Sequence, residues 1–247
     1  MDKFQKYEFD TLGYIVIKNV ISKDNIKKIN KYLNYFENLN EDQLPHGVCY
    51  GKERKNDELY LSNIVEADKI FIDLINIPKL IKIIEYIHAG NFRLNHTYSI
   101  HRWQKGYTYL HMGPVPVHPK AIYHFKGDEM FSLLSKIVFP ILNCKPEDGC
   151  FAVIPGSHKA NYERPFSNHP KDNPLLIPVT AEPGDAIIFT EALTHGSFIN
   201  TSGRTRRTLF YCYSVGYMPD WGNLSLKFSD NFHKRLNAQQ KKIIQLK

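Results

Sequence analysis

The sequence predicts a mainly β protein whose core is a barrel or two-sheet sandwich, with helices before and after it. From residue 92 to residue 217, short β-branched and aromatic runs alternate with Gly, Pro, Asp and Asn. Helical periodicity dominates about 22–90 and returns over about 230–246. With 247 residues and 43% hydrophobic content, the chain can bury a sizeable core, so we expect one domain over 1–247.

The N-terminal third contains one predicted strand and two predicted helical regions. A strand begins at Gly13 and ends at Ser22, a residue type that caps helix N-termini. Apolar residues then recur at three- and four-residue spacing, which predicts an amphipathic helix to about residue 38. A second helical region covers about 66–89, with Pro78 suited to a first turn and Gly90 to the end. The polar segment 38–58 between them is expected to be a surface connection that closes over a site.

The central region contains about eight candidate strands, which suggests a jelly roll. They are 92–103, 107–111, 121–125, 131–142, 150–154, 185–190, 195–200 and 206–216. The tail from Asp230 has apolar residues at helical spacing, which predicts a closing helix.

Composition narrows the function classes. The formal net charge is +7, but Lys and Arg are dispersed along the chain, which favours surface solubility over nucleic-acid binding. The apolar runs have the length of strands, so no membrane span is expected, and without a recognisable leader we expect a cytoplasmic protein. The four cysteines lack metal-site spacing and are expected to be reduced core residues.

Two histidines far apart in the chain, His111 and His195, are the strongest candidate metal ligands. A mononuclear iron(II) site that activates O2 needs two neutral imidazoles and one carboxylate on one face of an octahedron. The acid commonly stands two positions after the first histidine, but here that position is Gly113. Glu191, four positions before His195, is interpreted as an acid that supports a ligand histidine, although it could replace the missing ligand.

Several motifs together resemble the phytanoyl-CoA dioxygenase (PhyH) family of Fe(II)/2-oxoglutarate-dependent oxygenases. The resemblance covers about residues 7–217, and its motifs are Phe9-x-x-x-Gly13-Tyr14, His111, Pro155-Gly156-Ser157-His158, Glu182-Pro183-Gly184-Asp185, His195 and Arg206. It implies a double-stranded β-helix, a cupin-like jelly roll, with Fe(II), 2-oxoglutarate and O2 as cofactors.

The resemblance also implies which residue binds 2-oxoglutarate. Arg206 matches the position that binds the distal carboxylate, and a guanidinium suits a planar carboxylate. Thr208 shares its face of the strand and can donate a hydrogen bond. Arg207 faces the other way and would take the role only if the register slipped by one residue; either arginine could instead be a rim charge. His158 is interpreted as a solvated turn residue without an iron role.

The vacant carboxylate position at Gly113 leaves three alternatives open. The favoured one is a hydroxylase that acts on an unactivated C–H bond of a small molecule, anionic or carrier-bound, while 2-oxoglutarate is decarboxylated to succinate. The second is a halogenase with chloride bound at that position, and the third is a non-catalytic binding barrel. Segments 38–58 and 112–130 are candidate substrate lids. The oligomeric state is not predicted.

Overall fold

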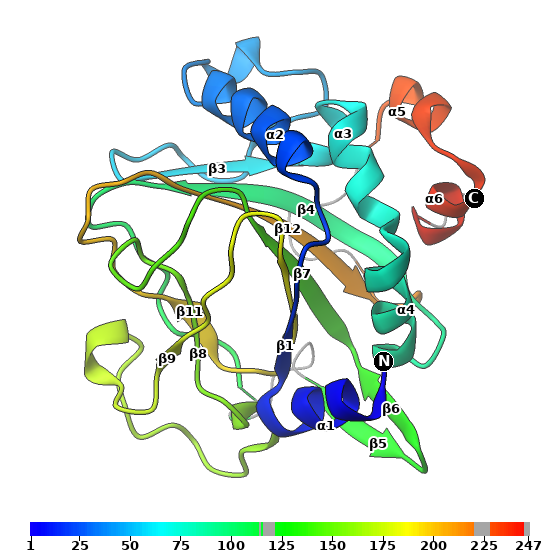
Figure 1. Ribbon diagram of the computed structural model, residues 1–247, viewed down its shortest axis with the longest axis vertical. Helices are drawn as coiled ribbons and strands as arrows, with labels where there is room; N and C mark the ends of the chain where they lie inside the picture. The colour runs from blue at the N-terminus through cyan, green and yellow to red at the C-terminus, as the bar shows by residue number, and fades with distance from the viewer. Residues whose placement is uncertain (114, 116–121, 220–227, 245–247) are drawn as a thin grey trace.

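Two antiparallel sheets face each other in the computed structural model, which describes residues 1–113, 115, 122–219 and 228–244 (Figure 1). The larger sheet has the order β1-β10-β7-β12-β4-β3-β2, and the smaller one has the order β11-β8-β9. A hairpin of β5 and β6 forms a third, separate sheet. The strands are β1 (Tyr14–Ile17), β2 (Cys49–Tyr50), β3 (Glu58–Ser62), β4 (Arg93–Arg102), β5 (Tyr123–Lys126), β6 (Glu129–Ser132), β7 (Leu134–Pro140), β8 (Phe151–Val153), β9 (Ile177–Pro178), β10 (Ala186–Thr190), β11 (His195–Ser197) and β12 (Arg206–Ser214).

Helices cover the outer face of the larger sheet, on the side away from β8 and β11 (Figure 1). They are α2 (Lys23–Phe36), α3 (Lys69–Ile72), α4 (Pro78–Ile87), α5 (Asp230–Arg235) and α6 (Ala238–Ile244). The first helix, α1 (Lys3–Leu12), lies instead at the lower end of the molecule beside β1 and β5 (Figure 1). Short 3-10 turns occur at Glu41–Gln43, Ile64–Glu66, Asp73–Asn76, Ser157–Lys159 and Pro170–Asp172. Buried tyrosine hydroxyls tie this layer to β12, since Tyr211 donates to the Phe71 carbonyl at 2.6 Å and Tyr213 to the Ile75 carbonyl at 2.7 Å.

The alternation of side chains along β12 separates two environments. Leu209, Tyr211 and Tyr213 belong to the apolar cluster under the helices. Phe210 and Cys212 belong to the cluster between the two sheets. Successive residues of a strand point to opposite faces. The same strand therefore lines the helix-covered core with one set of residues and the barrel interior with the other.

The predicted jelly-roll core is confirmed, as are the helix capped by Ser22 and the helix that begins at Pro78. The strands and helices that the sequence did not predict include α1, the edge strands β2 and β9, and β3, which lies between β4 and β2. The segment 131–142 divides into β6 and β7, and the tail forms two short helices instead of one. That the whole chain is one domain stays a prediction.

The predicted strand 107–111 is wrong as a regular strand. Its backbone bonds β11 at two places, with Ser197 N–H donating to the Thr108 carbonyl and His111 exchanging two bonds with His195. One more residue lies between these bonds on the 108–111 side than on the β11 side. This bulge breaks the ladder, so only a single bridge remains.

Three further predictions need correction. His158 is buried, not solvated, and its Nε2 lies 3.0 Å from the Asp10 carbonyl oxygen of α1. Of the four cysteines, all free, only Cys150 and Cys212 are buried. In the candidate lid 112–130, residues 114 and 116–121 lie outside the described residues, as do residue 121 of the predicted strand 121–125 and residues 245 and 246 of the predicted tail helix. Met112, Gly113 and Val115 of the candidate lid line the larger of the two cavities described below, whereas residues 122–131, in and beside the β5–β6 hairpin, line neither.

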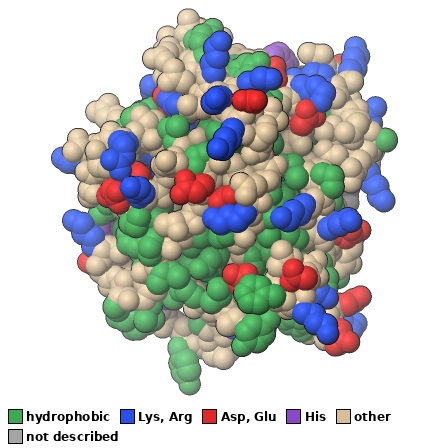
Figure 2. Space-filling view, in the orientation of Figure 1, with side chains coloured by type: hydrophobic (Ala, Val, Ile, Leu, Met, Phe, Trp, Pro, Cys, Tyr) green, Lys and Arg blue, Asp and Glu red, His purple; other side chains and the backbone are tan. Residues whose placement is uncertain are grey.

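The surface view shows Lys and Arg side chains scattered among acidic and apolar ones on the face of Figure 1 (Figure 2). That the chain binds no nucleic acid stays a prediction. Among the described helices, none combines the length and the apolar character needed to cross a bilayer. A cytoplasmic location is likewise an expectation.

Candidate metal centre

His111 and His195 lie directly opposite each other, in spite of their separation in the chain. His111 N–H donates to the His195 carbonyl at 3.0 Å, and His195 N–H donates to the His111 carbonyl at 3.1 Å. Their ring centroids are 4.2 Å apart. A hydrogen-bonded pair of this kind puts both side chains on the same face of the sheet. The bulge in segment 107–111 therefore ends at the His111–His195 pair, where the two imidazoles lie side by side.

The hydrogen bonds of both rings fix their tautomers. His111 Nδ1 lies 2.9 Å from the Tyr109 carbonyl oxygen, and His195 Nδ1 lies 2.7 Å from that of Leu193. A carbonyl only accepts, so each Nδ1 must carry a proton, and the lone pair of each neutral ring is on Nε2. Burial lowers the pKa of both histidines, and the positive charge of Lys136 adds to this effect at both rings. The Glu191 carboxylate opposes it at His111, but the net shift is still downward, so the rings are neutral at pH 7.

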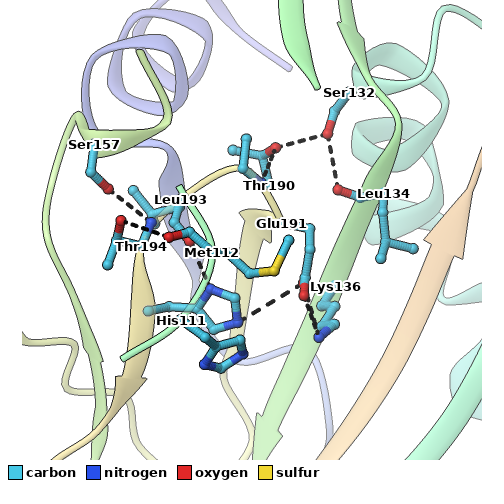
Figure 3. Close-up of polar contacts among 12 residues, drawn as sticks. His111, Met112, Ser132, Leu134, Lys136, Ser157, Thr190, Glu191, Leu193 and Thr194 are labelled. Carbon is cyan, nitrogen blue, oxygen red and sulfur yellow. Dashed lines mark hydrogen bonds and ion pairs between the residues drawn. The ribbon is translucent and has the colours of Figure 1, made fainter. Parts of the chain in front are cut away.

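Glu191 is the third ionisable side chain at this place. One donor atom from each of His111, Glu191 and His195 lies within 4.8 Å of the other two, and Glu191 Oε2 is 3.9 Å from His195 Nε2. Figure 3 shows the carboxylate between the Lys136 ammonium and the imidazole rings. Lys136 Nζ lies 3.0 Å from Oε1 and 2.9 Å from Oε2. Burial alone would lower the pKa of Lys136, but the Glu191 carboxylate, Cys212 and Tyr60 together outweigh burial and raise that pKa.

These donors fit a divalent iron ion. Two neutral imidazoles with unprotonated Nε2 atoms and one carboxylate are the set that non-haem iron(II) oxygenases use. The proton on each Nδ1 is held by a backbone carbonyl, which is how ligand histidines are commonly oriented. These described side chains therefore suit iron(II), the metal expected from the sequence.

A cavity of about 260 Å³ adjoins this cluster inside the barrel. Both histidines, Glu191 and Lys136 line it, together with an aromatic wall in which Tyr98 stacks on Tyr60 and Phe210 at centroid distances of 4.7 and 4.6 Å. Such a volume holds only a small molecule, below the usual range of drug-sized pockets.

Two arginines from neighbouring strands line the same cavity. Arg206 of β12 is buried and lies in the cavity, donating from Nη1 to the Gly149 carbonyl at 2.6 Å and from Nε to Thr208 Oγ1 at 3.2 Å. Arg102, its partner across β4 and β12, pairs with Glu58 and has a buried Nε without a hydrogen-bond partner among the described residues. The cavity thus has a carboxylate and imidazoles in one part and guanidinium groups in another.

Arg207 lies on the opposite face of the sheet. It forms a two-pronged ion pair with Glu37 and hydrogen bonds to Asn30 and Asn34 on α2. The alternative in which the register slips by one residue is therefore not the arrangement of this structure. Thr208 accepts the hydrogen bond of Arg206 and so orients the guanidinium.

A second, larger cavity of about 700 Å³ lies beside the first, and His111 lines both. Its wall includes Tyr162, Glu163, Arg164 and Asn168 from the segment after β8. Lys52 of the segment 38–58 lines the smaller cavity. Of the three metal candidates, His111 therefore stands at the boundary between the smaller cavity and the larger one.

Gly113 has a backbone that a carboxylate residue would not adopt easily. Its φ is +111°, and a Cβ built on it would lie 2.9 Å from Thr194 Oγ1. Non-glycine residues rarely occupy this region. The backbone at position 113 therefore favours glycine. The acid near the histidines is Glu191, from the turn after β10.

Lys136 and Arg102 are residues of this site that were not predicted from the sequence. Lys136 is the single charged residue of β7, whose other residues are apolar except Ser135, and a charged residue is seldom buried without a partner. That pattern was a usable signal. No sequence pattern pointed to Arg102, because its position in the cavity depends on the pairing of β4 with β12.

Comparison with known proteins places these observations in one family. The sequence model of the phytanoyl-CoA dioxygenase (PhyH) family matches residues 9–208. The dioxygenase olcK of Penicillium canescens is 26% identical over 208 residues, which cover 80% of this chain and 65% of that protein. The dioxygenase af480 of Aspergillus fumigatus is 30% identical over 112 residues, or 44% of this chain and 35% of that one. The chain thus spans less than two thirds of either curated relative.

Among solved structures, HygX from Streptomyces hygroscopicus with nickel, 2-oxoglutarate and hygromycin B bound has the same fold. Its TM-score is 0.78 at 20% identity, and the match covers 90% of both chains. The family match extends over most of the sequence and includes both histidines and Arg206. The chain belongs to the phytanoyl-CoA dioxygenase family of non-haem iron, 2-oxoglutarate-dependent dioxygenases.

Proposed function

We propose that this protein is an Fe(II)/2-oxoglutarate-dependent oxygenase that hydroxylates an unactivated C–H bond of a small molecule. The observation that carries the proposal is the pair of neutral imidazoles, His111 and His195, on the wall of a cavity that also contains the Arg206 guanidinium. Family membership and the bound 2-oxoglutarate of HygX support it.

In this proposal, His111 and His195 bind the iron through Nε2. The bound iron and 2-oxoglutarate would supply the activation of O2, with decarboxylation of 2-oxoglutarate to succinate. Arg206 binds the distal carboxylate of 2-oxoglutarate, and Thr208 and the Gly149 carbonyl hold its guanidinium in place. Arg102, whose Nε has no hydrogen-bond partner among the described residues, could add a second donor. The aromatic wall of Tyr60 and Tyr98 excludes water.

The substrate is proposed to bind in the larger cavity. Its volume of about 700 Å³ is within the range for drug-sized ligands, and His111 lies on its wall. A target carbon there would lie beside the metal. Hygromycin B is what HygX binds, and it illustrates the size of molecule that this fold accepts. An anionic or carrier-bound substrate remains our expectation for this basic chain.

Halogenation is the less favoured alternative, although Gly113 leaves the common carboxylate position vacant. Chloride would need a vacant anionic position at the metal, but the Glu191 carboxylate already faces His195 at 3.9 Å. A non-catalytic binding barrel would not need two imidazoles that hydrogen bonds hold in fixed orientations, so we do not favour it.

The test is spectroscopic and then chemical. Anaerobic addition of Fe(II) and 2-oxoglutarate should give a visible charge-transfer band, and admission of O2 should give succinate. His111→Ala should abolish both. Folded wild-type protein without the band, or succinate formation that His111→Ala leaves unchanged, would contradict the proposal.

A further inference from the structure

We infer that Glu191 is the carboxylate ligand of the metal, supplied from the turn before the second histidine instead of from position 113. The inference rests on the proposed function, because it names the third ligand of the same iron. It differs from the interpretation of Glu191 as an acid that merely orients a ligand histidine.

The hydrogen bonds of the imidazoles exclude that orienting role. An acid that orients a metal-bound histidine accepts the proton of the nitrogen that does not bind metal. In His111 and His195 that nitrogen is Nδ1, and the carbonyls of Tyr109 and Leu193 already accept both protons. Glu191 instead lies 3.9 Å from Nε2 of His195, the nitrogen with the lone pair.

The spacing of the donor atoms suits a shared ion. At 3.9 Å, Glu191 Oε2 and His195 Nε2 are too far apart for a hydrogen bond. Two acceptors facing each other without a proton between them would repel. A metal bonded to each at about 2 Å removes this conflict. One donor atom of His111 lies within 4.8 Å of both, so the three can reach one ion with small side-chain movements.

One turn positions both Glu191 and His195. Glu191 N–H donates to the Leu134 carbonyl at 2.9 Å, and Leu193 N–H donates to the Thr190 carbonyl at 3.0 Å. Thr190 Oγ1 lies 2.8 Å from Ser132 Oγ, which fixes the start of the turn (Figure 3). The Leu193 carbonyl then holds the His195 ring. The geometry between the two ligands is therefore set within five residues.

Lys136 makes a buried carboxylate tolerable at this place. A fully buried anion is costly without a partner, and Lys136 contacts both oxygens of Glu191. When one oxygen binds metal, the other can keep its contact with the ammonium. Lys136 is thus a positioning residue. This arrangement also explains why position 113 can be glycine.

Anaerobic titration with Co(II), without 2-oxoglutarate, tests the assignment by affinity and by the visible spectrum of the bound ion. We expect Glu191→Gln to weaken Co(II) binding by more than about 100-fold, beyond the 10- to 100-fold cost of losing an outer partner. His111→Ala is the reference for a lost ligand. Glu66→Gln is the matched control, because Glu66 is also buried and paired with a cation, Arg235, but lines neither described cavity.

Glu191→Gln leaves Lys136 without its counter-charge, so Lys136→Met/Glu191→Gln is tested alongside to keep a folded protein available. The assignment is supported if Glu191→Gln and the double variant each lose Co(II) affinity to within tenfold of the loss in His111→Ala. A smaller loss overturns the assignment. If wild-type protein binds no Co(II), the proposed function fails as well. If wild-type binds and only His111→Ala loses the metal, the function stands and the inference alone fails.

Discussion

Arg206 and Arg207 are neighbours in the chain, but they act in different parts of the molecule. Arg206 points into the barrel cavity, and Arg207 pairs with Glu37, the C-cap residue of α2. The two-residue repeat of a strand decides this difference, because adjacent side chains must point to opposite faces. Residue identity alone does not distinguish the two guanidiniums.

Arg206→Lys should weaken 2-oxoglutarate binding by about 10- to 100-fold, measured as its dissociation constant in the presence of Co(II). Lysine keeps the charge but loses the planar pair of donors, and a hydrogen bond to a charged group is worth about 1.5–3 kcal/mol. Arg204→Lys is the matched control, since Arg204 is exposed and lies two positions earlier. Equal 2-oxoglutarate affinities for the two variants would contradict the role of Arg206.

Lys136→Met should destabilise the metal-free protein by about 3–5 kcal/mol, because Glu191 is left buried and unpaired. Added Co(II) should recover much of this loss, since the ion supplies the missing positive charge. Urea unfolding of both proteins with and without Co(II) measures the effect. The same difference between wild-type and variant in both conditions would contradict a metal bound at Glu191.

Gly113→Asp should not create the common His-x-Asp arrangement. At a φ of +111° and with its Cβ 2.9 Å from Thr194 Oγ1, aspartate should lower the free energy of unfolding by about 1–3 kcal/mol without raising Co(II) affinity. Gly203→Asp is the control, because its φ is also positive and nothing lies within 4 Å of its built Cβ. A Gly113→Asp protein as stable as Gly203→Asp would show that the loop tolerates the acid.

At the scale of elements, α2 is held to the larger sheet by a buried polar cluster. Glu37 accepts two hydrogen bonds from Arg207 and lies 2.6 Å from His101 Nδ1 of β4. Burial alone would raise the pKa of Glu37, but the hydrogen bonds from Arg207 and His101 lower it to about 2. This cluster fixes the outer face of the strands whose inner faces carry the cavity.

The Glu37 carboxylate should make stability depend on pH in a defined window. Its pKa falls from 4.5 in the unfolded chain to about 2, so its contribution of about 3 kcal/mol is complete above pH 4.5 and is lost as the pH falls toward 2. Glu37→Gln should lower stability at pH 7 and reduce the slope between pH 4.5 and 2. Urea unfolding across this range measures it. Glu85→Gln, at an exposed position of α4, should leave the slope unchanged.

At the scale of the whole molecule, two sheets enclose one small cavity to which distant parts of the chain contribute. His111 comes from the loop after β4, Glu191 from the turn after β10, and Arg206 from β12. The larger cavity opens beside them, so the proposed cosubstrate and substrate spaces meet at His111. A ligand that contacts residues from several of these elements should therefore raise the free energy of unfolding of the protein.

Added 2-oxoglutarate should therefore stabilise the protein mainly when metal is present. At about 100 times its dissociation constant it should add about 2.7 kcal/mol to the free energy of unfolding. The same concentration with a chelator should add much less, because only the guanidinium end of the cavity then binds it. Thermal unfolding with and without Co(II) measures this, with succinate as a control ligand. Equal stabilisation with and without metal would contradict a shared site.

The sequence by itself determined the fold class and the main ligand candidates of this protein. Strand alternation and punctuation over residues 92–217 predicted the jelly roll, and motif order identified His111, His195 and Arg206. These signals are local, because side-chain periodicity and turn residues act within a few positions.

Only the tertiary structure decided how Glu191 relates to the histidines. Its neighbours in the chain do not say whether a carboxylate faces Nδ1 or Nε2 of a ring whose partner comes from another strand. That depends on the bulge opposite β11, on the carbonyls that take both Nδ1 protons, and on the pairing that brings Lys136 of β7 beside the turn. Such contacts between segments far apart in sequence arise from packing, and no short-range pattern encodes them.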